Sequence, residues 1–131
     1  MSQFVFEAHS GFRYVVLLVG AAAVVASLAG WSGGATSGGG RLALRLYRVF
    51  VGTLDIQLLL GITVAVVRPF HPQYIGHIVM VALAIAVAHV VNARLRKAPE
   101  EARRPAAVLT GVLISMGLIV GGILAIGRPI V

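Results

Sequence analysis

The stretch Leu54–Val91, LDIQLLLGITVAVVRPFHPQYIGHIVMVALAIAVAHVV, decides the fold of this chain. It holds two long apolar runs, joined at residues 68–74 by a short turn with two prolines. The full spans to which these runs belong, residues 49–67 and 75–91, are each close to the roughly 20 residues that a helix needs to cross a bilayer. Polar side chains inside such runs are costly, so each needs a partner or a function. The four that need an explanation are Asp55, Gln57, His77 and His89.

The composition of the whole chain indicates an integral membrane protein. Of the 131 residues, 59% are hydrophobic and only 11% are charged, which is too little charge for the surface of a soluble domain. A chain of this length has room for one domain, residues 1–131. The net charge of +7 favours loop cations that orient a membrane protein over nucleic-acid binding. The absence of cysteine excludes disulfides, thiolate metal sites and covalent haem attachment.

Four apolar spans are predicted, at about residues 11–30, 49–67, 75–91 and 106–126. The connection at 31–48 contains SGGATSGGG and is predicted to be a flexible linker with nothing to pack. The connection at 92–105 is charged. Short connections between consecutive spans predict an all-α fold, a four-transmembrane-helix bundle in up-down order.

The basic residues predict the orientation of this bundle. The connections at 31–48 and 92–105 hold eight of the eleven Lys and Arg residues. Because basic loops stay in the cytoplasm, both termini are predicted to be extracytoplasmic. The first ten residues contain no Lys or Arg, so we expect no cleaved signal peptide.

Two histidines are predicted to lie level at the outer end of the bundle. His9 precedes the first span, and His77 lies in the first turn of the third, on the diagonal helix. Facing imidazoles are what a six-coordinate haem iron requires, so they predict a non-covalent b-type haem. Gly61, Gly121 and Gly122 are predicted to leave room for the macrocycle. The spacing of these residues is equally consistent with an alternative. In it, the histidines form hydrogen bonds at the ends of their helices, and the glycines only let helices pack closely.

Three arginines are predicted at the same outer surface: Arg13, Arg68 and Arg128. Because a guanidinium offers a planar fork to carboxylates, these side chains are candidates to hold haem propionates. The alternative is that they reach the lipid headgroups.

A second polar group is predicted in the inner half. It comprises Asp55, His89 and Ser115, and His89 lies about 18 Å along the helix from His77. The group is a candidate for proton conduction or quinone contact. A buried hydrogen bond that fixes helix register is the alternative, and we favour it.

The sequence QLLLGITVAV, followed by a short loop with HP and a helix with a histidine near its start, resembles one four-helix half of haem A synthase. The resemblance implies that His9 and His77 bind one haem near the outer face. The segment FEAHSGFR is similar to the family's first-helix segment and implies that Glu7 lies near the substrate. Glu7 precedes His9 by two residues rather than three, and Arg13 follows by four rather than directly. The chain also resembles small bacterial membrane proteins of the cytochrome b type that begin with HS-x-x-R.

These patterns favour a b-type cytochrome of a bacterial or archaeal plasma membrane. It would exchange electrons with quinol or with a respiratory or photosynthetic complex. The alternatives are a half-size haem A synthase-like enzyme that oxidises a haem methyl group, and a haem-free accessory subunit. Because only one half is present, we expect a homo-oligomer or a subunit of a larger complex, embedded in membrane lipid.

Overall fold

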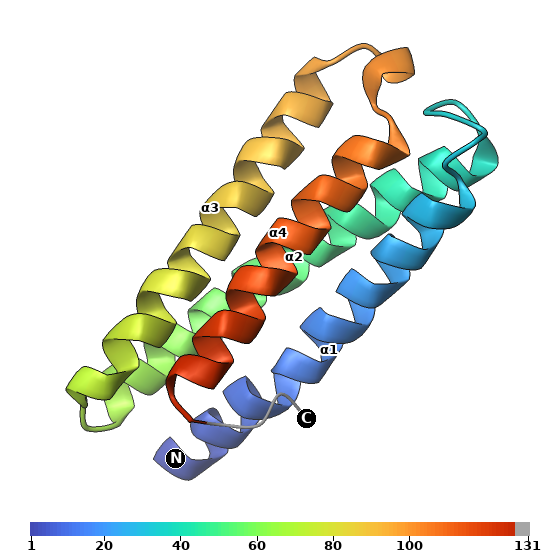
Figure 1. Cartoon of the computed structure of the whole chain (residues 1–131). Coiled ribbons are helices and arrows are strands. Elements are labelled where there is room, and N and C mark those ends of the chain that lie inside the picture. The colour runs from blue at the N-terminus through green and yellow to red at the C-terminus, as the bar shows by residue number, and fades with distance from the viewer. Residues whose placement is uncertain (128–131) are drawn as a thin grey trace.

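The computed structural model describes residues 1–127, and in that range the regular structure is entirely helical. Its long helices are α1 (Ser2–Ala29), α2 (Gly38–Val67), α3 (Ile75–Lys97) and α4 (Pro105–Ala125), and successive helices run in opposite directions (Figure 1). Two short 3₁₀ turns, η1 (Pro72–Tyr74) and η2 (Glu100–Ala102), lie in the connections. All four long helices are long and apolar enough to cross a membrane. The predictions of an all-helical chain and of four helices long and apolar enough to span a membrane are confirmed within the described residues.

Three helices extend beyond the predicted spans. α1 begins at Ser2, α2 begins at Gly38, and α3 continues to Lys97. The added turns are the polar ends of the helices, where side chains pair at helical spacing: Gln3 Nε2 donates to Glu7 Oε1 at 2.7 Å. Apolarity marks the part of a helix that crosses hydrocarbon, and the helix itself continues into the interface.

The connection between α1 and α2 is a compact turn, and the prediction of a flexible linker is wrong. Gly34 has φ +76°, which favours glycine. Ser37 caps α2, because its Oγ accepts from the Gly40 N–H at 3.0 Å and donates to the Gly34 carbonyl at 2.8 Å. A Cβ on Gly30 would lie 2.6 Å from the Gly39 carbonyl carbon, and one on Gly40 would collide with the Gly34 carbonyl. These glycines therefore let two backbone segments touch.

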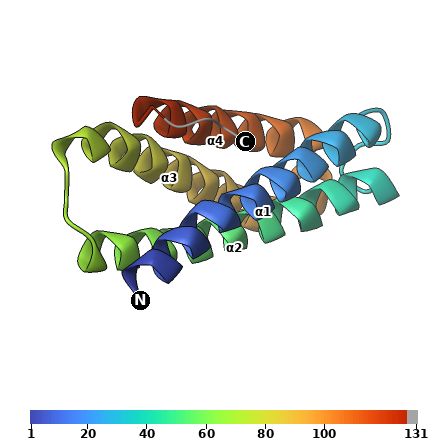
Figure 2. The same ribbon diagram turned by 90° about the horizontal axis from the view of Figure 1, so that it is seen from below.

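The four helices form two hairpins that diverge toward one end. α1 packs mainly on α2 and α3 mainly on α4, and the hairpins meet chiefly through α1 and α4. Figure 2 shows the hairpins close together at the end with the α1–α2 turn and far apart at the end with the α2–α3 connection. We call the first the closed end and the second the splayed end. The start of α1 and the end of α4 lie at the splayed end.

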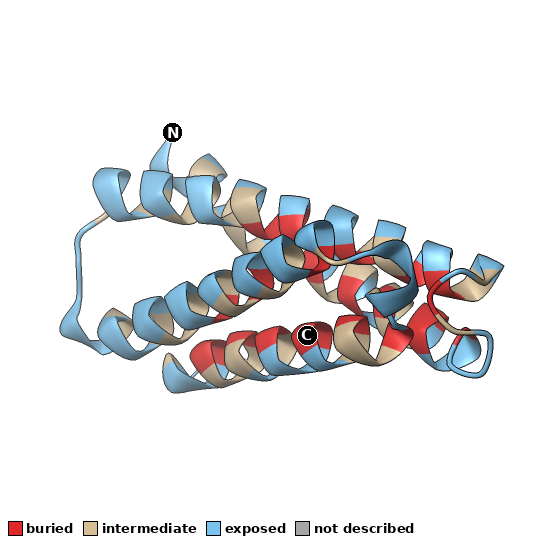
Figure 3. Cartoon of the chain, turned by 90° about the horizontal axis from the view of Figure 1, so that it is seen from above, coloured by how far each residue is buried: buried red, intermediate tan, exposed pale blue. Residues whose placement is uncertain are grey.

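The packed core follows this division. Figure 3 shows the buried residues of α1, α2 and α3 gathered toward the closed end, whereas α4 is buried along most of its length. Tyr47, Phe50 and Leu54 are the largest fully buried side chains, and the Tyr47 hydroxyl donates to the Ala88 carbonyl at 2.7 Å. No residue in 1–15 or 55–83 is buried. The closed end therefore holds most of the packed core, and at the splayed end α4 alone contributes buried residues.

Candidate functional site

The space between the hairpins at the splayed end is a cavity of about 520 Å³, within the range of small-molecule and cofactor sites. Side chains from all four helices line it, and most of them are apolar. The polar lining residues are His9, Ser10, Arg13, Gln57, Arg68, Gln73, Tyr74 and His77. This arrangement suits a ligand with a broad apolar body and a few polar groups.

The structure brings His9 of α1 and His77 of α3 together at this cavity. Their ring centroids are 6.4 Å apart, with the ring planes at 89°. The Nδ1 of His77 lies 3.0 Å from the Gly122 carbonyl, a contact in which Nδ1–H donates and Nε2 keeps its lone pair for another partner. The Nδ1 of His9 is buried and has no partner in residues 1–127.

Gln57 holds His9 from the neighbouring helix. Its Nε2 donates to the backbone carbonyl of His9 at 2.9 Å, while its Oε1 is buried without a partner among the described residues. We had not predicted Gln57 as a site residue from the sequence. The available signal was an uncharged polar side chain, one helical turn before Gly61, in an apolar run.

The three predicted glycines lie against the histidines and against Met80. A Cβ on Gly61 would be 3.1 Å from Cε1 of His9, and one on Gly122 would be 3.4 Å from Nδ1 of His77. A Cβ on Gly121 would be 2.7 Å from Cε of Met80. The missing side chains therefore admit the imidazoles and the α3–α4 contact, and Gly61 also lines the cavity.

Two of the three predicted arginines line the cavity. Nε of Arg13 and Nη1 of Arg68 are buried without a partner in residues 1–127. Nη2 of Arg13 donates to the Tyr14 hydroxyl at 2.9 Å, and the guanidinium of Arg68 lies 4.3 Å from the centroid of the Phe6 ring. Arg128 lies outside the described residues.

Unpaired polar atoms concentrate at this one site. Among residues 1–127, five buried side-chain nitrogen or oxygen atoms have no hydrogen-bond partner, and four of them belong to residues that line the cavity. Folded proteins pair nearly all such atoms. The cavity therefore has the chemistry of a binding site for a ligand that supplies those partners.

The predicted inner group is only partly present. Nε2 of His89 lies 2.7 Å from Oδ1 of Asp55, so these two side chains do meet. Ser115 does not join them: its hydroxyl donates to the Ala84 carbonyl at 3.1 Å, because it faces the α3–α4 contact whereas the pair lies between α2 and α3. The pair is also about half exposed, so the favoured interpretation is confirmed for the hydrogen bond between the helices and wrong for its burial.

Glu7 is not brought to the cavity. It is exposed on α1, accepts a hydrogen bond from Gln3, and is not among the lining residues. A carboxylate placed there does not face a ligand held between His9 and His77.

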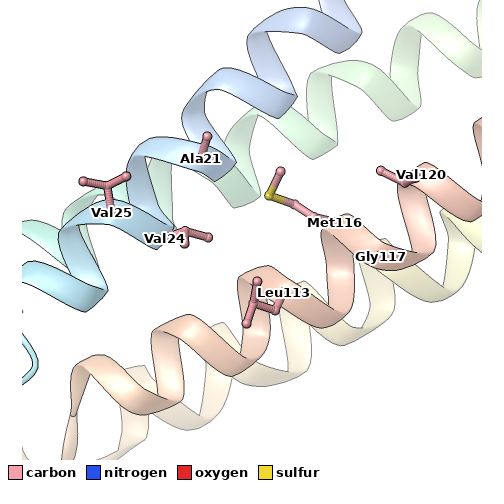
Figure 4. A pocket seen from close by; sticks show the side chains of 7 residues that line it. All are labelled: Ala21, Val24, Val25, Leu113, Met116, Gly117 and Val120. Carbon is pink, nitrogen blue, oxygen red and sulfur yellow. The ribbon is translucent and has the colours of Figure 1, made fainter. Parts of the chain in front are cut away.

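A second hollow of about 540 Å³ lies between α1 and α4 (Figure 4). Its lining residues are Ala21, Val24, Val25, Leu113, Met116, Gly117 and Val120. All seven are apolar, so this hollow offers nothing to orient a polar ligand and suits a lipid chain.

No protein-family model, curated protein or solved structure matches this chain.

Proposed function

We propose that this chain is a b-type cytochrome that holds one non-covalent haem at the splayed end, with His9 and His77 as the axial ligands of the iron. The observation that carries the proposal is that two facing imidazoles and four partnerless polar atoms surround one largely apolar cavity. The iron of a haem binds imidazoles, its ring matches the apolar lining, and its two carboxylates can accept hydrogen bonds from the guanidinium groups of Arg13 and Arg68. Gln57 Oε1 is an acceptor and gains no partner from such a group.

The spacing of the histidines fits such a group. Metal–nitrogen bonds of about 2 Å, added to roughly 1 Å from each ring nitrogen to its ring centre, separate two imidazole centroids by roughly 6 Å. The observed separation is 6.4 Å. Two histidine ligands suit an iron whose other ligands come with a macrocycle.

The surrounding residues have separate tasks in this proposal. The Gly122 carbonyl orients His77, and Gln57 holds the backbone of His9. Arg13 and Arg68, which both line the cavity, bind the propionates through their guanidinium groups. When bound, the haem supplies a one-electron redox couple, which suits electron transfer between quinol and a respiratory or photosynthetic complex. The methyl-oxidising alternative is not favoured, because Glu7 lies outside the cavity.

The purified protein is expected to contain one b-type haem per chain. With no cysteine in the chain, no thioether forms to a vinyl group, so acidic acetone should extract the pigment completely. A pyridine haemochrome assay on protein expressed with adequate haem supply measures both type and stoichiometry. Folded helical protein that lacks a Soret band under these conditions would contradict the proposal.

We further propose that the splayed end and both termini face away from the cytoplasm, in the plasma membrane of a bacterium or archaeon. The α1–α2 turn and the start of α2, together with the end of α3 and the α3–α4 connection, carry eight of the eleven Lys and Arg residues, all at the closed end. Alkaline phosphatase fused after residue 131 is therefore expected to be active. An inactive phosphatase beside a fluorescent cytoplasmic reporter at the same point would refute this orientation.

A further inference from the structure

Asp55 and His89 lie outside both the packed core and the cavity. Their side chains are 50% and 47% exposed at the seam between α2 and α3. Asp55 is seven residues from Arg48, and His89 is five residues from Arg94, which puts the pair about 8–10 Å along the helices from the cationic closed end. Ionisable side chains at such depth face a protein partner or water rather than hydrocarbon. The pair therefore needs cover that one copy of the chain does not supply.

The two side chains share one hydrogen bond, and each has a second polar atom that can form another: Nδ1 of His89 and Oδ2 of Asp55. Nε2 of His89 donates to Oδ1 of Asp55 at 2.7 Å, and no other bond joins either side chain to residues 1–127. With His89 protonated, the pair offers a donor at Nδ1 of His89 and an acceptor at Oδ2 of Asp55. A donor beside an acceptor is self-complementary. In a two-fold dimer, each imidazolium would donate to the carboxylate of the other copy, and no foreign charge would be needed.

The surface around the pair is suited to close approach by another helix. α3 is the least covered long helix, with only Ala84, Ala88 and Leu95 buried. Ala86 lies three residues before His89, Gly52 lies three residues before Asp55, and both are exposed. A Cβ on Gly52 would meet nothing within 4 Å. Small residues beside a polar group are typical of contacts between membrane helices, where short side chains let backbones approach.

We propose that the α2–α3 face is the interface at which two copies of this chain pair in the membrane, with Asp55 and His89 of each copy completing the hydrogen bonds of the other. The large exposed side chains of this face, including Leu59 at 64% and Val66 at 79% exposure, then pack against the second copy. The proposal does not depend on haem, because neither side chain lines the cavity.

The absence of native cysteine allows a direct test with single-cysteine variants in membranes. Ala86→Cys places a thiol on the proposed interface, and Leu18→Cys places one on α1 at a similar distance from the closed end, where the side chain is 71% exposed. A bismaleimide with a flexible spacer should link Ala86→Cys into a species of twice the chain mass and leave Leu18→Cys monomeric. Equal linkage at both positions, no linkage at Ala86→Cys, or linkage only to a different protein would each overturn the proposal.

A second experiment tests the role of the polar pair. Two differently tagged copies are co-expressed, and co-purification reports their association. The double variant Asp55→Leu/His89→Leu is expected to associate about tenfold more weakly, since interhelical hydrogen bonds in membranes are individually modest. Thr110→Val is the control, because Thr110 is an exposed polar residue that bonds only within α4. Unchanged association of the double variant would show that the pair does not hold the interface.

Discussion

Replacing either His9 or His77 with alanine is expected to abolish low-spin haem in the purified protein. Each substitution removes one of two imidazoles whose centroids are 6.4 Å apart, and no third histidine lines the cavity. Met80 does not substitute for His77, because its methyl carbon is packed at the position of Gly121. The measurement is haem content and spin state, from optical and electron paramagnetic resonance spectra, at equal amounts of folded protein.

Asp55→Asn and His89→Ala are the matched controls for this experiment. Both alter polar residues on the membrane-spanning helices but leave the cavity unchanged, so their spectra should match the parent protein. Haem that is lost in His89→Ala and retained in His9→Ala would move the site to the α2–α3 seam and refute the proposed axial pair.

Gly40→Ala is expected to destabilise the bundle more than other single-methyl additions at the closed end. Gly40 is buried, and its added Cβ would collide with the Gly34 carbonyl and approach the Ala35 carbonyl oxygen at 3.0 Å. Backbone atoms in a capped turn have little room to yield. We expect a loss of at least about 2 kcal/mol, in the range of overpacked sites, as a lower midpoint in detergent unfolding followed by circular dichroism.

Gly38→Ala provides the control from the same turn. A Cβ on Gly38 would meet nothing within 4 Å, and alanine favours a helix over glycine by up to about 1 kcal/mol. This variant should be as stable as the parent or slightly more so. If the two variants unfold at the same midpoint, the close backbone approach at the turn is not a determinant of stability.

The helices were predictable because apolar length and basic connections are properties of the sequence itself. The meeting of His9 with His77 and of Asp55 with His89 was also predictable, since 1.5 Å per residue fixes the depth of each side chain once the spans are known. The depth of a residue does not show how its helix is rotated about its axis, and so does not show which neighbour its side chain faces. For that reason Ser115 was grouped with a pair that it does not contact, and Gln57 was not recognised as the side chain that holds His9.

The turn between α1 and α2 shows a different limit. A glycine-rich segment has the same composition whether it is a mobile linker or a site where two backbones touch. The distinction depends on Gly30 and Gly39, which lie on opposite sides of the turn and meet only after the hairpin has formed. Tertiary contacts of this kind are not encoded by any local pattern.

The contrast between the closed and splayed ends has a consequence for assembly order in the cell. The packed core, whose largest buried side chains are Tyr47, Phe50 and Leu54, lies mostly outside the splayed end and forms without a ligand. A newly made chain could therefore stay folded in the membrane before the proposed haem arrives. Under this proposal, supply of haem, rather than synthesis of the chain, sets how much mature protein accumulates.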